Sequence, residues 1–277
     1  MELALALVLG LVIGSFLNVC IARLPLEQSI SVPRSHCPQC KKQIAFYDNV
    51  PLLSYMLLGG RCRSCKKPIS ARYPSVEAAT GLISVLLYWK FGLTVAWGFY
   101  LLFCCALLVL ALIDVDHRIL PDPITLNGIW VGVIASVTLA QPGAFVTRLL
   151  TWAGLQVDNP RLVAFIGSIL GMVVGGGLLW LVGEVYFRIR GIEGMGFGDV
   201  KMMAMVGAFL GAPLTMFTIM MGSLLGSVIG LVLIRFGGKT REYELPFGTF
   251  LGIAGIVAVL YGDVLIQIYI DRVIQPL

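Results

Sequence analysis

The first twenty residues, MELALALVLGLVIGSFLNVC (1–20), decide the fold class, because they run apolar for nearly the whole length of a membrane-spanning helix. No basic stretch precedes this run, so we interpret it as a retained first span and not a cleaved signal. The whole chain is similar: 58% of its 277 residues are hydrophobic, 13% are charged, and the mean hydropathy is +0.92. Soluble domains carry about 25% charged residues. The composition therefore indicates a multi-spanning membrane protein and excludes an ordinary soluble domain.

Further apolar segments follow the first one, separated by short polar stretches. We count eight in all, at 1–22, 75–89, 94–114, 123–140, 161–187, 199–212, 214–234 and 246–270. The fold class predicted is an all-α polytopic membrane protein with about eight transmembrane helices. Its domains are a first transmembrane helix at 1–22, a polar insert at 23–74 and a seven-helix membrane domain at 75–277. Glycines at 171–177 and 222–230 offer small helix faces for close packing.

The basic residues predict the orientation of these segments. With the N-terminus outside, sixteen of the twenty Lys and Arg residues fall on one side and four on the other. The sixteen are Arg23, Arg34, Lys41, Lys42, Arg61, Arg63, Lys66, Lys67, Arg72, Arg118, Arg188, Arg190, Lys201, Arg235, Lys239 and Arg241. The four are Lys90, Arg148, Arg161 and Arg272. Because cytoplasmic loops carry the excess of basic residues, the insert and the other basic loops are expected in the cytoplasm.

The insert contains four cysteines in two CxxC pairs. Cys37 and Cys40 are followed, after twenty-one residues, by Cys62 and Cys65. Four thiolates at this spacing can close a tetrahedron around Zn²⁺, and four protein ligands leave no open position for catalysis. A redox pair is the main alternative, but its usual βαβ context is absent. We predict a structural zinc site.

Two carboxylates lie where apolar runs meet the cytoplasmic side. Asp114 ends the third segment, and Asp199 begins the sixth inside the glycine-rich run GMGFGDVK (194–201). They are 85 residues apart in sequence but are expected at the same membrane depth. Two carboxylates held close share a proton, so that one can activate water while the other polarises a scissile carbonyl. The glycines would let an extended peptide approach Asp199 closely.

Simpler interpretations remain for each acid taken alone. Asp199 could be a helix N-cap, and Asp114 could be the first polar residue after a span. Asp116 and Asp122 are expected to be more exposed and to orient the loop, Glu184 is a further candidate for an inner polar network, and Asp263 is expected to have a structural partner. Whether Asp116, Glu184 and Asp263 assist the pair is left open.

Five elements in order resemble the bacterial type IV prepilin peptidases. They are GSFLNVCIARLP (14–25), the paired CxxC motifs, ISARYPSVEAATG (69–81), IDVDHRILPD (113–122) and GFGD (196–199). The resemblance spans about residues 10 to 255. It implies an inner-membrane enzyme that removes the basic leader from prepilins and pseudopilins at the cytoplasmic face. It also implies that the enzyme methylates the new N-terminal amine with S-adenosylmethionine.

The resemblance assigns site residues as well. It implies that Asp114 and Asp199 are catalytic, that the four cysteines bind structural Zn²⁺, and that 75–277 is the protease domain. No Rossmann glycine fingerprint is present, so a Rossmann site for S-adenosylmethionine is not supported. The resemblance instead implies Arg72, Glu77 and the GSFLN segment as candidates for binding it, although Arg72 could be an interfacial anchor and Glu77 a helix-start acid. The expected partners are prepilins, pseudopilins and the lipid bilayer, and no nucleic acid is expected.

Two other classes of membrane protein were weighed. A metalloprotease is disfavoured because there is no HExxH sequence and only two histidines, His36 and His117. An ion-coupled transporter would place its acids near the membrane midplane and would show an internal repeat, and no convincing repeat is found.

Overall fold

The structure is a computed structural model that describes residues 1–140, 143–192, 194–236 and 245–269. Within these ranges the elements are helical, without a named strand. The chain divides into two compact units, Met1–Cys105 and Ala106–Leu277, and the division falls inside helix α4 (Val95–His117). Three residues used for the orientation, Lys239, Arg241 and Arg272, lie outside the described residues, as does the last residue of the segment 246–270.

The first unit is built on two long helices joined by the polar insert. Helix α1 (Glu2–Arg23) packs against α3 (Arg72–Phe91), and the insert between them holds only short elements: η1 (Leu24–Leu26), η2 (Phe46–Asn49) and α2 (Leu53–Leu57). The two long helices approach closely at glycines. A Cβ on Gly10 would lie 2.6 Å from the Ser84 Cβ, and one on Gly14 would lie 2.8 Å from the Glu77 Cα. The Ser84 hydroxyl also donates to the Ala6 carbonyl at 2.6 Å, so a polar group is satisfied inside an apolar contact.

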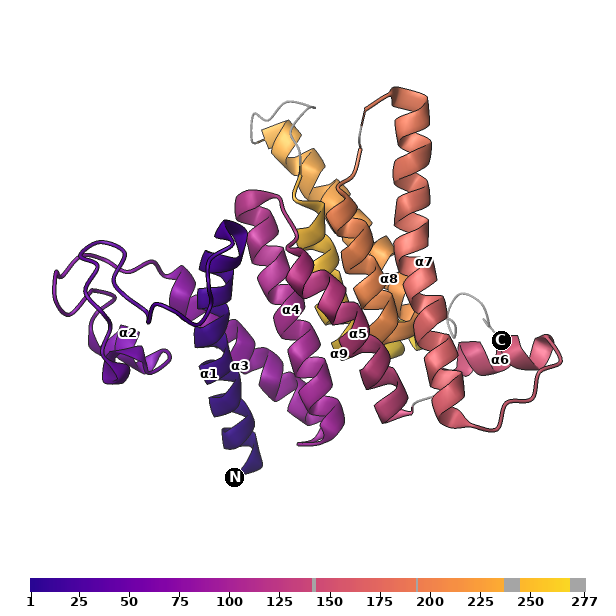
Figure 1. The fold of residues 1–277 in the computed structure, drawn as a ribbon, viewed down its shortest axis with the longest axis horizontal. Helices are drawn as coiled ribbons and strands as arrows, with labels where there is room; N and C mark the ends of the chain where they lie inside the picture. The colour runs from indigo at the N-terminus through magenta and orange to yellow at the C-terminus, as the bar shows by residue number, and fades with distance from the viewer. Residues whose placement is uncertain (141–142, 193, 237–244, 270–277) are drawn as a thin grey trace. The chain divides into compact units, whose positions relative to one another are not determined.

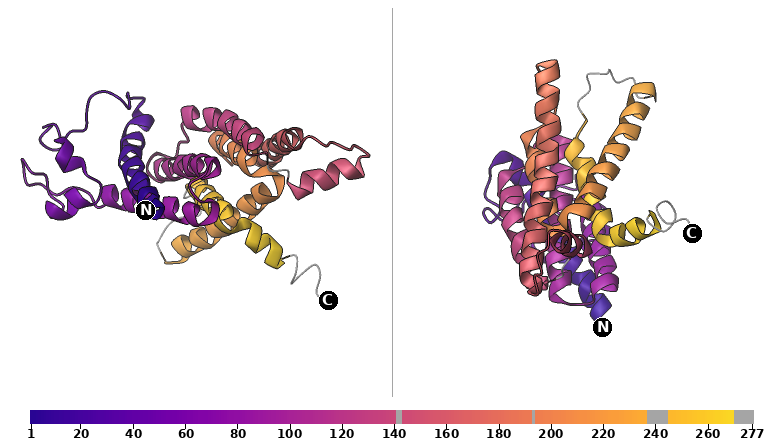
Figure 2. Two further views of the ribbon diagram at one scale, coloured as in Figure 1. Left: turned by 90° about the horizontal axis from the view of Figure 1, so that it is seen from below. Right: turned by 90° about the vertical axis from the view of Figure 1, so that its right-hand side faces the viewer.

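The second unit contains the remaining helices. They are the end of α4, α5 (Asp122–Leu139), the short α6 (Ala144–Trp152), α7 (Pro160–Arg190), α8 (Phe197–Phe236) and α9 (Phe247–Tyr269). Figure 1 shows α7 lying along α8, and Figure 2 shows α9 beside α8 from two further directions. The local sequence sets the ends of α7: the Asn159 side chain caps the N–H of Arg161 at 3.0 Å, and Gly191 ends the helix in the left-handed conformation.

Helix α8 reverses its direction at one residue. Gly211 has φ 70° and ψ 172°, a backbone conformation that interrupts the helix and that favours glycine. Before this point Met202 lies beside Gly252 of α9, whereas after it Gly222 and Gly230 face Leu251 and Leu245. The first half therefore runs parallel to α9 and the second half runs antiparallel to it. The predicted segments 199–212 and 214–234 are these two halves.

Glycine faces bring α7 and α8 together, as the sequence predicted for 171–177. A Cβ on Gly171 would strike the carbonyl oxygen of Gly207, and a Cβ on Gly207 would strike that of Gly171. Without side chains at either position, the two backbones approach more closely than ordinary helices do. This contact fixes where the first half of α8, and hence Asp199 at its start, lies in the second unit.

The class of fold is confirmed, but the count of eight spans is not. In the described part of the chain, six helices are long and apolar enough to cross a membrane: Glu2–Leu26, Val95–His117, Asp122–Leu139, Pro160–Arg190, Phe197–Phe236 and Phe247–Ile268. The difference has two sources. Helix α8 counts once although it reverses at Gly211, and α3 is less apolar because it carries Arg72, Glu77 and Lys90.

Candidate active site and metal centre

Asp114 lies near the end of α4 and is held by α9. Its side chain is buried, with the residue 6% exposed. Oδ2 accepts the backbone N–H of Thr249 at 2.7 Å and its hydroxyl at 3.0 Å, and the same hydroxyl lies 2.9 Å from the Ala111 carbonyl. Residue 249 is 135 positions away in sequence, so this contact depends on tertiary structure. The backbone N–H of Thr249 fixes the orientation of the Asp114 carboxyl group, and the single hydroxyl proton is shared between Asp114 and the Ala111 carbonyl.

Asp199 lies in the first turn of α8 and is 8% exposed. Its backbone N–H donates to the Gly196 carbonyl at 3.1 Å, which closes the glycine-rich loop onto the helix. No hydrogen bond to its carboxylate is formed within the described ranges, so the side chain does not serve as a helix cap there. At the residue before Asp199, a Cβ on Gly198 would lie 3.0 Å from the Leu120 Cβ. This position therefore leaves little room for any side chain.

The two carboxylates converge on Gly248 of α9. A Cβ at this position would lie 3.1 Å from Asp199 Oδ1 and 3.2 Å from Asp114 Oδ2. A single methyl-sized position therefore touches an oxygen of each acid. Two acids that are 85 positions apart in sequence are therefore brought to the same residue of α9, where a pair of carboxylates could act together.

Sequence reasoning missed Gly248 and Thr249. Both follow Pro246 in the stretch LPFGTF (245–250), just before the last apolar segment. A proline followed by a glycine and a hydroxyl residue at the start of a span is a weak local signal, because prolines and threonines are common near helix starts. Only the packing of α9 against α4 and α8 shows what the two residues touch.

The other acids lie apart from this pair. Asp122 is exposed and accepts the Lys201 ammonium group at 2.7 Å. Glu184 accepts Arg188 at 2.8 Å within the same helix, so that its partner is a neighbouring side chain of α7. Asp116 and Asp263 are exposed. Of the acids singled out from the sequence, the structure brings Asp114 and Asp199 together.

The four cysteines of the insert form one cluster. Their sulfur atoms all lie within 4.8 Å of one another, and the sulfurs of Cys37 and Cys65 are 3.9 Å apart. Each CxxC pair is folded in the same way: the N–H of Cys37 donates to Lys42 and that of Cys62 donates to Lys67, each at 2.9 Å.

These turns bring the four sulfur atoms close enough together to ligate one tetrahedrally coordinated ion. Backbone N–H groups of Cys65 and Ser64 donate to the Cys62 sulfur and lower its pKa, whereas burial and the neighbouring cysteine thiols raise the pKa of Cys65. The donor set fits Zn²⁺, which prefers thiolates in structural sites. Among the His, Cys, Asp and Glu side chains of the described residues, the cluster that could hold a metal ion consists of these four cysteines. Four protein ligands leave no open position for catalysis.

Of the groups named for the methyl donor, Arg72 and Glu77 lie in the first half of α3, and the GSFLN segment (14–18) lies in α1. Glu77 is buried, and its Oε2 accepts the N–H of Leu52 at 2.8 Å, which ties the helix to the insert. Arg72 is half-buried and lies five residues before it, so the two side chains leave α3 in different directions. Each has a chemistry that S-adenosylmethionine could use, since a carboxylate can accept ribose hydroxyls and a guanidinium can bind a carboxylate.

The fold and these groups define a polytopic helical membrane protein with a buried carboxylate pair and a four-cysteine insert. Residues 8–91 match the family model described as the bacterial peptidase A24 N-terminal domain, and residues 101–231 match the type IV leader peptidase family. The chain belongs to this family.

Curated relatives agree with the family match. The protein named prepilin leader peptidase/N-methyltransferase of Stutzerimonas stutzeri is 37% identical over 96% of this chain and 93% of its own length. Those of Pseudomonas aeruginosa and Legionella pneumophila, with the same name, are 36% and 35% identical over 96% and 94% of this chain, and each is covered over 92% of its length. No solved structure matches the chain.

Proposed function

We propose that this protein cleaves the leader from prepilins and pseudopilins and then N-methylates the new N-terminus. The observation that carries the protease proposal is the convergence of Asp114 and Asp199 on Gly248. The family membership and the names of the relatives support both activities. We further propose that the reaction takes place at the cytoplasmic face of the inner membrane of a bacterium; the excess of basic residues on one side of the predicted spans supports this orientation.

In the proteolytic step the two carboxylates act as a pair. One, ionised, takes a proton from a water molecule bound between them while the other, protonated, donates a hydrogen bond to the scissile carbonyl oxygen. Thr249 orients Asp114 through two hydrogen bonds, and the missing side chain of Gly248 leaves the space that the substrate backbone enters. Collapse of the tetrahedral intermediate passes the proton to the leaving amine.

The two other proposed sites have separate tasks. The proposed Zn²⁺, held by the four cysteines, would link the two CxxC turns of a segment that has few core residues of its own. Arg72 and Glu77 are proposed to bind S-adenosylmethionine, which supplies the methyl group when bound. We also propose that the chain consists of a first transmembrane helix at 1–22, a cytoplasmic insert at 23–74 and a seven-helix protease domain at 75–277.

The test is cleavage of a purified prepilin by the purified protein in detergent, with methylation of a pre-cleaved pilin measured separately. Asp114→Asn and Asp199→Asn should each lose cleavage while retaining methylation. Asp122→Asn is the matched control, because that acid is exposed and paired with Lys201. Cleavage at the wild-type rate by either of the first two variants would exclude the carboxylate pair as the catalyst.

A further inference from the structure

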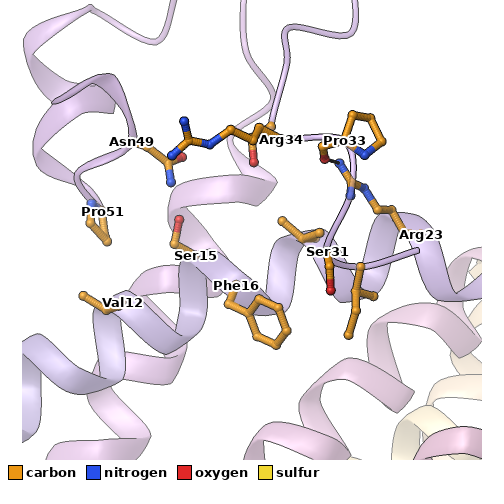
Figure 3. A pocket seen from close by; sticks show the side chains of 12 residues that line it. Val12, Ser15, Phe16, Arg23, Ser31, Pro33, Arg34, Asn49 and Pro51 are labelled. Carbon is orange, nitrogen blue, oxygen red and sulfur yellow. Dashed lines mark hydrogen bonds between the residues drawn. The ribbon is translucent and has the colours of Figure 1, made fainter. Parts of the chain in front are cut away.

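A cavity of about 350 Å³ lies in the first unit, between the second half of α1 and the insert. Figure 3 shows the side chains around it. Helix α1 forms one wall, and the loop that follows η1 forms the other. The lining residues are Val12, Ser15, Phe16, Val19, Arg23, Ile30, Ser31, Pro33, Arg34, Ser35, Asn49 and Pro51. They comprise two arginines and several hydroxyl or amide side chains, but no acid.

The two arginines have different tasks. The guanidinium group of Arg23 donates to the carbonyls of Ser29 at 2.9 Å and Pro33 at 2.6 Å, and so holds the loop against the end of α1. Arg34 is exposed and forms no ion pair among the described residues. Its guanidinium group extends toward the Asn49 side chain (Figure 3), and its positive charge is therefore uncompensated by an acid of the cavity lining. A ligand that carries a negative charge would complement it.

The rest of the wall is apolar and continues along α1. Val12 is 54% exposed and Phe16 is 49% exposed, and they stand one helical turn apart. Both belong to a helix long and apolar enough to cross a membrane, so this exposed face suits an acyl chain. The cavity thus joins a cationic end to an apolar stripe, a combination that matches a phosphate ester attached to a hydrocarbon chain.

The methyl donor fits this cavity less well. S-Adenosylmethionine carries a sulfonium cation and an ammonium group, and it has a single carboxylate. Two guanidinium groups without a lining acid repel such a ligand. Ser15 and Phe16 of the GSFLN segment line the cavity, but the other two candidates for the methyl donor, Arg72 and Glu77, do not.

We propose that this cavity binds the headgroup of one anionic phospholipid, with Arg34 at the phosphate and an acyl chain along Val12 and Phe16. The lipid would thereby anchor the insert to the bilayer next to the end of α1. Basic side chains next to a membrane are favourable for anionic lipid by about 1 kcal/mol each, and thus by roughly fivefold in affinity.

The test measures lipid binding to the purified full-length protein in detergent by native mass spectrometry, with dioleoyl phosphatidylglycerol and dioleoyl phosphatidylcholine as probes. The wild type should retain phosphatidylglycerol at least about fivefold more tightly than phosphatidylcholine. Arg34→Gln should weaken phosphatidylglycerol binding about fivefold. Ser31→Asp adds a negative charge to the cavity and leaves both arginines in place, and it should weaken this binding by a similar factor. Arg61→Gln is the matched control: it removes the same charge from the insert but does not line the cavity.

Three results would overturn the proposal. Equal losses in Arg34→Gln and Arg61→Gln would show that lipid responds to the overall charge of the insert. Displacement of the lipid by an equal concentration of inorganic phosphate would show a simple anion site that does not recognise the lipid. Displacement by S-adenosylmethionine would assign the cavity to the methyl donor. The thermal stability of each variant, compared with the wild type, separates loss of binding from loss of folding.

Discussion

Thr249 offers the sharpest test of how the carboxylate pair is held. Its hydroxyl lies 3.0 Å from Asp114 Oδ2 and its N–H lies 2.7 Å from the same oxygen. Thr249→Val keeps the β-branched shape and the backbone donor but removes the hydroxyl. A hydrogen bond to a carboxyl group is worth about 1 to 3 kcal/mol, depending on its charge. If that energy positions Asp114 for the reaction, cleavage should slow by roughly 5- to 150-fold.

The assay is the initial rate of prepilin cleavage at saturating substrate, with methylation of a pre-cleaved pilin as an internal measure of folding. Thr249→Ser should recover most of the lost rate, because it restores the hydroxyl. Thr218→Val is the matched control: Thr218 is buried in the same unit, but its hydroxyl donates to Leu214 of its own helix at 2.8 Å. A Thr249→Val rate equal to that of Thr218→Val, or no recovery with serine, would refute the positioning role.

Three further substitutions give defined outcomes. Gly248→Ala should abolish prepilin cleavage while methylation of a pre-cleaved pilin is retained, since the added methyl group would crowd both carboxylates and the Leu120 side chain. Gly171→Ala should lower the unfolding temperature by several degrees, because its Cβ would strike Gly207 and separate α7 from α8. Cys37→Ser should reduce bound zinc from one ion per chain to nearly none by elemental analysis, and limited proteolysis should then cut within 23–74.

Each of these variants has its own control and contrary outcome. Gly177→Ala, at a glycine of α7 with nothing within 4 Å, should leave the unfolding temperature unchanged. Equal effects of the two α7 substitutions would mean that the close approach of α7 and α8 is not what stabilises the unit. Cys20→Ser, outside the cluster, should retain zinc. Wild-type cleavage by Gly248→Ala would mean that the substrate does not enter between the acids.

The sequence by itself determined the features that depend on neighbouring residues. Length and hydropathy are local properties, so the apolar runs predicted helices that the structure contains, including α1 and α4. The CxxC spacing is also local, because each turn places two sulfurs on one side of a short loop. The resemblance to the prepilin peptidases, which the family match confirms, rested on such short motifs as well.

Tertiary structure alone decided which distant groups meet. Asp114 and Asp199 were paired from their expected depth, but their convergence on Gly248, and the hold of Thr249 on Asp114, depend on how α9 packs against α4 and α8. The sequence divided this apolar run between 212 and 214, but that the chain reverses its direction at Gly211 is known only from how the two halves pack against α9. The physical reason is that a glycine allows two helix backbones to approach closely, but the residues next to it in the sequence do not determine which helix packs against it.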